Sequence, residues 1–288
     1  MNRRRGLKAA ALAAVFCIIV VASLNAYWRY YPVESGLFEM SVLDVGQGDA
    51  ILLETPTGQT VLIDGGPDKK VLTRLGEELP FWEHRIDLVV VSHPHEDHIA
   101  GLIPVLERYE VGALMITGIQ TKSATYARLL EVASARNVPL FIADSPRRLE
   151  FGGLNLSLLF PQTSLSGKRI ANLNNSSIVV KATYGTIDIL LTGDAEEIEE
   201  KQLLAAKVDL SAEILKAGHH GSETSSSEAF VKAVNPKLAL ISDGTGNSYG
   251  HPSPRTLKRF ERLGIQTRRT DLEGTIHVMS DGKTFTLR

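Results

Sequence analysis

The chain has a single cysteine, Cys17, among its 288 residues. One cysteine excludes both a disulfide bond within the chain and a thiolate metal cluster. Internal repeats and low-complexity stretches are also absent from the sequence. With 43% hydrophobic residues, the chain can bury a full core, either as one large α/β domain or as two smaller ones.

An excess of positive charge is lacking as well, with 31 basic and 33 acidic residues in total. Residues 37–288 hold 26 basic and 32 acidic residues, a formal charge of −6. A generic nucleic-acid coat protein would be basic. A polyanionic substrate would therefore have to be held by a local basic patch and by metal ions.

Long hydrophobic runs are limited to one, the uncharged residues 9–26. This run follows Arg3, Arg4, Arg5 and Lys8 and precedes an aromatic cluster at 27–31. Its length suits a bilayer span, and the basic flank predicts an inside N-terminus and an extracytoplasmic domain. We expect a membrane anchor or signal segment at 1–36 and a catalytic domain at 37–288. An uncleaved anchor is favoured over a cleaved signal peptide that releases a secreted domain. A buried helix of a cytosolic protein is the third interpretation.

Four candidate metal ligands lie within six residues after the apolar segment 88–91: His93, His95, Asp97 and His98. A strand ending in a loop that enters a helix can point the first pair at one metal and the second pair at another. Imidazole and carboxylate are what Zn²⁺ prefers. The alternative, a histidine-rich polar loop, does not explain this density of ligands.

Beyond residue 37, short β-like runs alternate with helical patterns. Strands are expected at 37–45, 50–54, 59–63, 88–91, 113–117, 154–160, 177–182, 187–191, 213–216, 238–242 and 274–279. Helices are expected at 69–76, 98–109, 124–136, 195–206, 226–234 and 254–263. Two half-domains, each a sheet with its helices, would pack as a four-layer α/β sandwich.

Further acids and histidines follow other predicted strands. Asp64 ends one strand, Asp194 follows another, and the segment Gly218–Gly221 with His219 and His220 follows a third. Each alone is equally well explained as a turn residue. Together they predict one rim of metal ligands at the carboxyl ends of the strands.

These segments resemble the successive metal motifs of the metallo-β-lactamase superfamily. More narrowly, residues 44–50, 174–177, 219–222 and 249–252 resemble the extracytoplasmic domain of ComEC-type competence proteins. The resemblance covers 37–288. It implies an αββα sandwich with one or two Zn²⁺ ions at an edge of the paired sheets, and no organic cofactor.

By this resemblance, His93 and His95 would hold the first metal and Asp97 and His98 the second, with Asp194 bridging them. His219 or His220 would complete the second site. His219 is favoured, because it takes the position after glycine that usually binds metal in the superfamily. Adjacent strand residues point oppositely, so only one of the two is expected to bind.

The resemblance has one departure, at Asn174 and Asn175, where many members of the superfamily have a metal-binding histidine. An amide is a poorer Zn²⁺ ligand than an imidazole. The first metal would then bind weakly, use water, or be a harder ion such as Mn²⁺. One tightly bound ion is an alternative to two.

The predicted chemistry is hydrolysis by a water that the metal activates. Asp97 or Asp64 would orient that water, and His220 or His251 would donate a proton to the leaving group. Substrate oxygens would contact residues on the surrounding loops: Lys216, Ser222, Asn175 and His251. The alternatives are a helix-capping loop around Ser222 and a structural role for His251.

A basic surface is predicted on the helix that begins near Pro254. Its apolar residues share one face, and the other face carries Arg255, Lys258, Arg259 and Arg262, with Arg268 and Arg269 nearby. This surface would suit a polyanion, although a solvated helix face is the simpler interpretation.

Three functions remain open. The first is a membrane-anchored phosphodiesterase or nuclease acting on DNA outside the cytoplasm. The second is hydrolysis of a cell-wall choline phosphate ester, a lactone or a β-lactam. The third is a non-catalytic binding module that a metal stabilises. ComEC-type proteins carry a multi-span channel region, whereas this sequence has one hydrophobic segment, so transport of DNA would require partner channel or uptake proteins.

Overall fold

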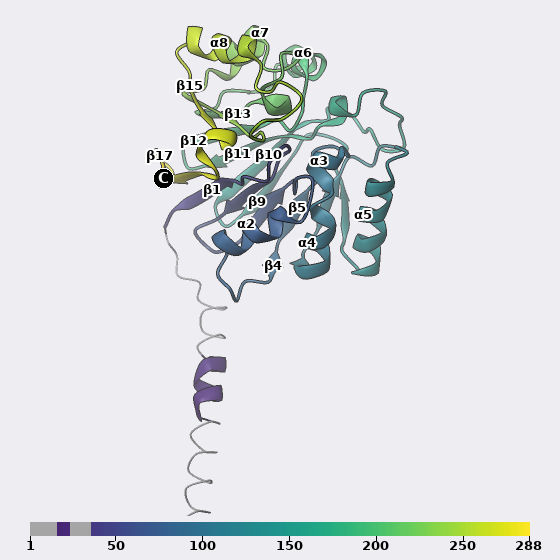
Figure 1. Ribbon diagram of the computed structural model, residues 1–288, viewed down its shortest axis with the longest axis vertical. Coiled ribbons are helices and arrows are strands. Elements are labelled where there is room, and N and C mark those ends of the chain that lie inside the picture. The colour runs from purple at the N-terminus through teal and green to yellow at the C-terminus, as the bar shows by residue number, and fades with distance from the viewer. Residues whose placement is uncertain (1–15, 24–35) are drawn as a thin grey trace, which may run out of the picture.

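The computed structural model describes residues 16–23 and 36–288. Residues 36–288 form two β-sheets packed face to face, with helices covering the outer face of each sheet (Figure 1). The four-layer αββα sandwich predicted from the sequence is therefore confirmed.

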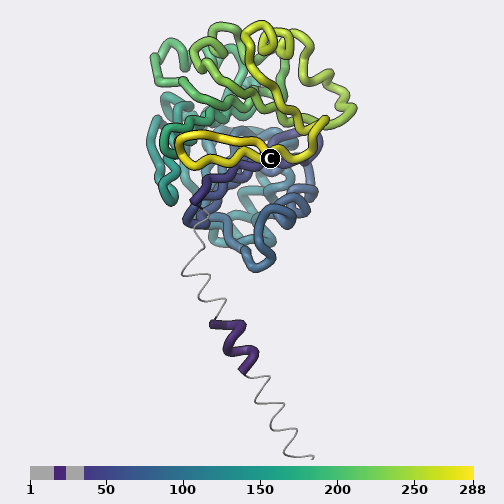
Figure 2. Tube along the Cα trace, turned by 90° about the vertical axis from the view of Figure 1, so that its left-hand side faces the viewer, coloured from purple at the N-terminus to yellow at the C-terminus, as the bar shows by residue number. Residues whose placement is uncertain are grey.

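The first sheet has eight strands. Their spatial order is β17 (Phe285–Leu287), β16 (Ile276–Ser280), β1 (Phe38–Val42), β2 (Ile51–Glu54), β3 (Thr60–Ile63), β5 (Leu88–Val90), β7 (Leu114–Ile116) and β8 (Leu140–Ile142). The helices packed on it are α2 (Lys70–Glu78), α3 (Glu96–Ile99), α4 (Leu102–Arg108) and α5 (Ala124–Ala135). Figure 2 shows the hairpin of β16 and β17, in yellow, lying beside the much earlier strand β1.

The second sheet has seven strands. Their order is β15 (Gln266–Arg269), β14 (Leu238–Ile241), β13 (Ile214–Lys216), β12 (Ile187–Leu191), β11 (Val179–Tyr184), β10 (Leu154–Phe160) and β9 (Arg147–Phe151). Its helices are α6 (Glu197–Ala206), α7 (Glu228–Val234) and α8 (Pro254–Arg262). The remaining elements are a small sheet of β4 (Arg85–Ile86) with β6 (Glu110–Val111), the 3₁₀ turns η1 (Leu173–Ser176) and η2 (Gly218–Gly221), and α9 (Thr270–Glu273).

Three apolar layers hold the sandwich together, one between the sheets and one beneath each set of helices. Strand β5 explains the pattern. Leu88 and Val90 pack between the sheets, whereas Val89 and Val91 pack under the helices, as alternation along a strand requires. A strand buried on both faces is apolar throughout, which is why this segment was recognisable in the sequence.

The topology brings the ligand-bearing loops to one edge of the sandwich. β3 and β5 are parallel neighbours in the first sheet, and β12 and β13 are parallel neighbours in the second. The carboxyl ends of parallel strands lie at the same edge. Asp64, His93, Asp194 and His220 each follow one of these four strands, so the predicted rim of strand ends is confirmed.

Two details of the predicted elements are corrected. The helix expected at 98–109 is two helices, α3 and α4, which meet at Gly101. A side chain at Gly101 would collide with the backbone oxygen of Gly65, so the chain turns there against the loop after β3. Four of the missed strands, β8, β9, β15 and β17, lie at sheet edges. Polar residues dominate β9 and β15, and β8 and β17 have only three residues each, so neither pair shows a clear apolar alternation.

Residues 16–23 are helical and their side chains are exposed. The rest of the segment predicted to cross a membrane, residues 9–26, lies outside the described residues. Among the helices that the structure does describe, none combines the length and the apolar character that a bilayer span needs.

Candidate metal centre

Asp64 orients the loop that carries His93, His95 and His98 through contacts with Ser92 and His98. Its Oδ1 accepts a hydrogen bond from the backbone N of Ser92 at 2.8 Å, and its Oδ2 accepts from Ser92 Oγ at 2.6 Å. His98 Nδ1 lies 2.8 Å from the same Oδ2, which leaves Nε2 facing the centre. Asp64 is fully buried with both oxygens occupied. The prediction that Asp64 orients the attacking water is therefore wrong, because its carboxylate fixes the ring of His98 instead.

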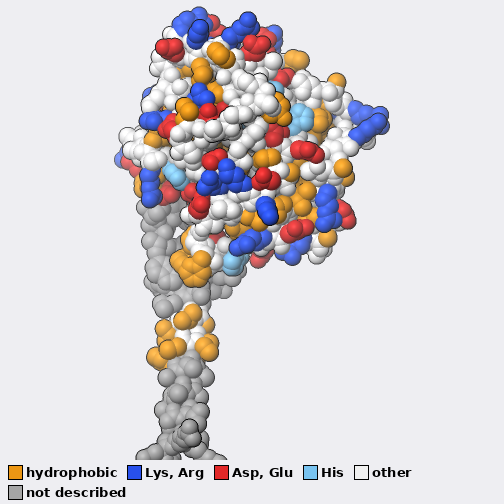
Figure 3. Space-filling model, in the orientation of Figure 1, with side chains coloured by type: hydrophobic (Ala, Val, Ile, Leu, Met, Phe, Trp, Pro, Cys, Tyr) orange, Lys and Arg blue, Asp and Glu red, His pale blue; other side chains and the backbone are white. Residues whose placement is uncertain are grey.

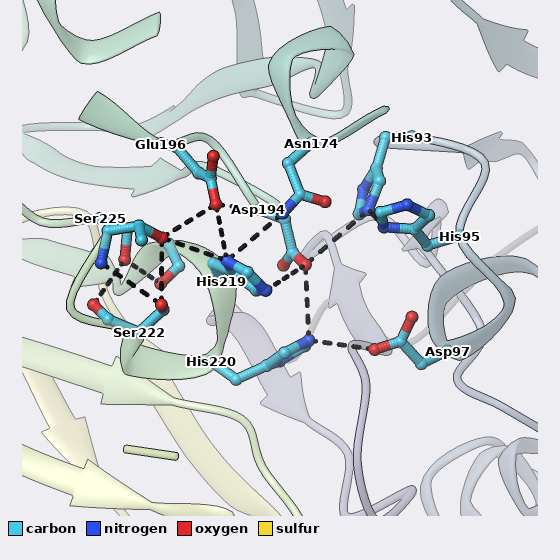
Figure 4. A network of polar contacts seen from close by, with 12 residues as sticks. His93, His95, Asp97, Asn174, Asp194, Glu196, His219, His220, Ser222 and Ser225 are labelled. Atoms are coloured by element: carbon cyan, nitrogen blue, oxygen red, sulfur yellow. Dashed lines mark hydrogen bonds and ion pairs between the residues drawn. The ribbon is translucent and has the colours of Figure 1, made fainter. Parts of the chain in front are cut away.

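Asp194 lies in the middle of the imidazole rings (Figure 4). Its backbone N is held by Ser177 Oγ at 3.2 Å. Distances from its Oδ2 to the Nε2 atoms are 3.3 Å for His98, 3.6 Å for His220, 3.7 Å for His93 and 3.9 Å for His219. A carboxylate surrounded in this way is placed to be shared by two cations, which is the role that the resemblance implied.

His220 takes the second-site position that the sequence assigned to His219. Its Nδ1 donates to the backbone oxygen of Ser242 at 2.8 Å, and its Nε2 lies 3.3 Å from Asp97 Oδ2. His220 is 1% exposed and groups with Asp97 and His98 as donors for one ion. The expectation of strand-like alternation was wrong, because both histidines have left-handed backbone angles in η2. With Nδ1 donating to Ser242 and Nε2 turned to the centre, His220 is also a poor proton donor to substrate.

Asp49 and Lys216 support His220 from the interior. Lys216 Nζ lies 2.7 Å from Asp49 Oδ2, and the other oxygen of Asp49 lies 3.3 Å from His220 Nδ1. Lys216 is completely buried, so the prediction that it contacts substrate is wrong. Asp49 was missed as a site residue. Its only signal in the sequence was its place directly after the glycine turn 46–48. The structure explains Gly48, because a side chain there would collide with the backbone oxygen of Asp97.

The other side of the centre is more open. His93 Nε2 and His95 Nδ1 are 2.9 Å apart and face the same space. Asn174, in η1, places its amide nitrogen 3.3 Å from His219 Nδ1, while its buried Oδ1 has no hydrogen-bond partner. An amide therefore stands beside the first-metal position, as the sequence departure predicted. Asn175 is not part of this network, and its contact with substrate stays a prediction.

Glu196 is a second residue that the sequence did not single out. Its Oε1 lies 3.1 Å from His219 Nδ1 and 2.8 Å from the hydroxyl of Thr224, which donates to it. It also accepts from the amide of Asn172 at 2.7 Å. Glu196 holds the His219 ring with its Nε2 toward Asp194. Its closeness in sequence to Asp194 was the only signal.

The electrostatics of the centre fit a cation. Burial alone would lower the pKa of the His98 imidazole, but Asp194 and Asp64 outweigh it and raise that pKa well above its usual value. Burial would also lower the pKa of the His220 imidazole, but Asp194, Asp49 and Asp97 outweigh it and raise that pKa to about 10. Protons thus compensate for an excess of carboxylates, and a metal ion would replace them.

Three buried atoms of the centre also lack hydrogen-bond partners: His98 Nε2, His220 Nε2 and Asp194 Oδ1. Unpaired buried polar atoms that converge on one point are costly unless a ligand satisfies them. One group of donors for an ion comprises His93, His98 and Asp194, and another comprises Asp97, His98 and His220. The residues present therefore fit one or two metal ions, without selecting the element.

Residues 43–242 match the family model described as the metallo-beta-lactamase superfamily. The chain belongs to this superfamily. Among solved structures with the same fold is the metallo-beta-lactamase fold protein YhfI from Bacillus subtilis, with a TM-score of 0.52 and 14% identity over 80% of this chain and 95% of that chain. Another is CmlA, a diiron β-hydroxylase from Streptomyces venezuelae, with a TM-score of 0.52 and 14% identity over 84% and 54% of the two chains.

Curated relatives are closer in sequence. The chain is 30% identical over 263 residues to ComE operon protein 3 of Bacillus subtilis, covering 85% of this chain and 33% of that protein. It is 28% identical over 263 residues to competence protein ComA of Neisseria gonorrhoeae, covering 91% and 35%. The resemblance to ComEC-type competence proteins and the prediction of a metallo-β-lactamase-fold hydrolase are confirmed. The chain spans about a third of the length of these relatives.

His251 and Tyr249 lie at the surface beside the candidate metal centre. The His251 ring lies 5.2 Å from the ring of His219, and the exposed Tyr249 stacks on its other side at 6.0 Å. Burial, with His219 and His220 nearby, lowers the pKa of His251 to about 4. A neutral imidazole suits the predicted substrate contact better than the predicted role as proton donor.

Ser222 follows η2 and stays within the protein. It is 5% exposed, its Oγ lies 3.0 Å from Thr224 Oγ1, and its backbone oxygen accepts from Thr256. The predicted contact with substrate is not supported. The alternative interpretation, a loop stabilised by its own hydroxyl groups, describes this segment.

The arginines of the basic surface expected on α8 are paired with nearby acceptors, whereas Lys258 is exposed and has no ion-pair partner among residues 16–23 and 36–288. Arg255 pairs with Glu223 at 3.0 Å, and Arg262 pairs with Glu228. Arg259 donates to backbone oxygens. Arg268 pairs with Glu273 and Arg269 with Asp271. The simpler interpretation, a solvated helix face, was the correct one for these arginines.

Proposed function

We propose that this metal-dependent hydrolase cleaves phosphodiester bonds in DNA. The observation that carries the proposal is the position of Asp194 between two sets of ligands, which suits two cations sharing one carboxylate. Paired cations can clamp the attacking and leaving oxygens of a phosphodiester. Similarity to competence proteins supports DNA as the substrate.

The residues divide the work by position. When bound, Zn²⁺ or Mn²⁺ would lower the pKa of a water and neutralise charge on the phosphate. Asp97, with 32% of its side chain exposed, remains the carboxylate able to orient that water and accept its proton. His251 lies at the surface beside His219, where its ring nitrogen can donate to or accept from a substrate oxygen.

A smaller substrate is the second candidate. The ion pairs along α8 and the formal charge of −6 for residues 37–288 both disfavour a long polyanion on that face. Both observations are compatible with a small substrate, such as a choline phosphate ester or a lactone, that contacts only the metal centre.

For the location, we propose that residues 9–26 anchor the domain outside the cytoplasm, beside a partner channel or uptake protein. The basic residues at positions 3–5 and 8 and the aromatic cluster at 27–31 support this. Protease treatment of intact spheroplasts should digest the domain while it stays with the membrane fraction. Recovery of the full chain in the soluble fraction would contradict the anchor.

The test of function uses the full chain, freed of metal and reloaded with either Zn²⁺ or Mn²⁺. Cleavage of single- and double-stranded DNA is followed beside Asp194→Ala. Metal-dependent cleavage that is absent in the variant supports the nuclease function. Hydrolysis of bis-p-nitrophenyl phosphate without DNA cleavage would favour the smaller substrate. Inactivity on both would contradict the phosphodiesterase proposal.

A further inference from the structure

Three cations lie on two neighbouring loops at the rim of the molecule: Lys122, Lys168 and Arg169. Lys122 lies on the loop between β7 and α5, and the other two lie between β10 and η1. Backbone hydrogen bonds join the loops, from Gln120 N to the oxygen of Lys168 at 2.8 Å and from Gly167 N to the oxygen of Gly118 at 2.9 Å. We call these three residues the cationic edge.

The cationic edge differs from α8 in having no counter-charges. All three side chains are exposed, and none forms an ion pair with any residue of 16–23 or 36–288. On α8, by contrast, Arg255 and Arg262 are each paired with a glutamate. Unpaired cations on the surface of an acidic domain create a local positive potential that attracts anions.

The cationic edge borders the metal centre through both of its loops. The first loop follows β7, the parallel neighbour of β5, so it leaves the sheet at the edge that carries His93. Thr125, just beyond this loop, donates to Glu96 at 2.8 Å and so ties it to α3. The second loop leads directly into η1, which places Asn174 beside His219.

The space-filling view agrees with this arrangement. Figure 3 shows Lys and Arg side chains gathered on the loop that protrudes at the right of the molecule, with histidine exposed on the same face. That loop is the teal one at the right of Figure 1. Positive side chains and a histidine thus lie on one face of the molecule.

We propose that the cationic edge binds the backbone phosphates of a polynucleotide next to the phosphodiester being cleaved. This inference rests on the proposed function and names its substrate-positioning residues. Lys and Arg neutralise phosphates and release condensed counterions, which makes the affinity depend steeply on salt. A substrate with a single phosphodiester ends at the metals and would not reach the cationic edge.

The test compares two triple variants with equal loss of charge. Lys122→Gln/Lys168→Gln/Arg169→Gln removes the cationic edge, and Arg255→Gln/Lys258→Gln/Arg262→Gln removes the same charge from α8. KM for a single-stranded 30-mer at about 0.1 M salt should rise roughly 10-fold or more in the first triple variant, and less than about twofold in the second. Activity on bis-p-nitrophenyl phosphate should stay unchanged in both.

Binding is measured separately, by fluorescence anisotropy of the 30-mer in an Asp194→Ala background across a salt series. The slope of log K against log salt should fall by about 2 when the cationic edge is removed, at about 0.7 per phosphate contact. Equal losses in both triple variants, or an unchanged slope, would overturn the inference. If wild type binds the 30-mer through the cationic edge but never cleaves it, the proposed nuclease function fails, and the cationic edge is a polynucleotide-binding surface without a role in cleavage.

Discussion

On one side of Asp194 the imidazoles are buried and held by fixed partners. On the other side His93 is buried too, but His95 and His219 are partly open, and His219 meets an amide. His98 and His220 are almost fully buried, and each Nδ1 is held by an acceptor, Asp64 or the backbone oxygen of Ser242. On the open side, His219 has 26% of its side chain exposed and lies beside Asn174.

This difference separates holding a metal from receiving a substrate. Hydrogen-bond partners that fix the ring orientation and tautomer of a histidine preorganise it for metal binding and so raise the metal affinity. The buried side is therefore expected to bind one ion tightly. The open side has a weaker donor set and borders the loops that carry the cationic edge, so its ion is expected to exchange more readily and to meet the substrate.

Removal of the shared carboxylate should have the largest effect. Asp194→Ala takes one ligand from both sides, so kcat/KM should fall by more than the roughly 100-fold that loss of an outer partner costs. Hydrolysis of bis-p-nitrophenyl phosphate measures the loss, and circular dichroism checks the fold. Activity within about tenfold of wild type would show that the two sides do not depend on Asp194.

The buried side can also be disrupted through the Lys216–Asp49 ion pair that supports His220. Lys216→Met takes from the buried Asp49 its lysine partner and leaves only His220 beside it, which should cost about 3–5 kcal/mol of unfolding free energy in urea. Lys181→Met is the matched control, because neither of its partners, Asp209 and Asp188, is fully buried, and the loss should be about 1 kcal/mol or less. Equal losses would mean that the pair beneath His220 has no special role.

The supporting carboxylates allow a direct comparison of the two sides. Asp64→Asn removes the acceptor that fixes His98, and affinity for the first Zn²⁺ should fall about 10- to 100-fold. Glu196→Gln acts on His219 and should leave that first affinity within about threefold. Competition with a chromophoric chelator measures both, and a reversed order would place the tight ion on the open side.

The smallest expected effect is an increase in affinity for the second Zn²⁺. Asn174→His offers an imidazole where the amide now stands, and affinity for the second Zn²⁺ should rise about tenfold. Asn175→His, on the neighbouring residue outside the network, should change neither affinity. If both variants bind zinc as wild type does, the amide does not limit the open side.

The sequence pointed to the candidate metal ligands but not to the residues that support them. His93, Asp194 and His98 follow buried apolar strands. The carboxyl ends of parallel strands lie at the same edge of a sheet, so this placement did not depend on the details of side-chain packing. The choice between His219 and His220 depended on left-handed backbone angles in η2, which no local pattern announces.

Partners distant in sequence were equally hidden. Lys216 looked like a surface cation, because Asp49 precedes it by 167 residues and only the packed sheets bring them together. The arginines of α8 looked unpaired for the same reason, since Glu223 and Glu228 come from the preceding loop and helix.

The most direct test of the two-sided centre is calorimetric titration of the metal-free full chain with Zn²⁺ at pH 7, in two buffers of different ionisation enthalpy. The fixed partners of His98 and His220 predict a first ion at least about tenfold tighter than the second. The raised pKa values of the same two imidazoles predict that this ion displaces about two protons. The second ion should release fewer, because burial and the neighbouring His98 hold the pKa of His93 well below its usual value. Two ions of equal affinity, or a first ion that binds without releasing protons, would contradict the account.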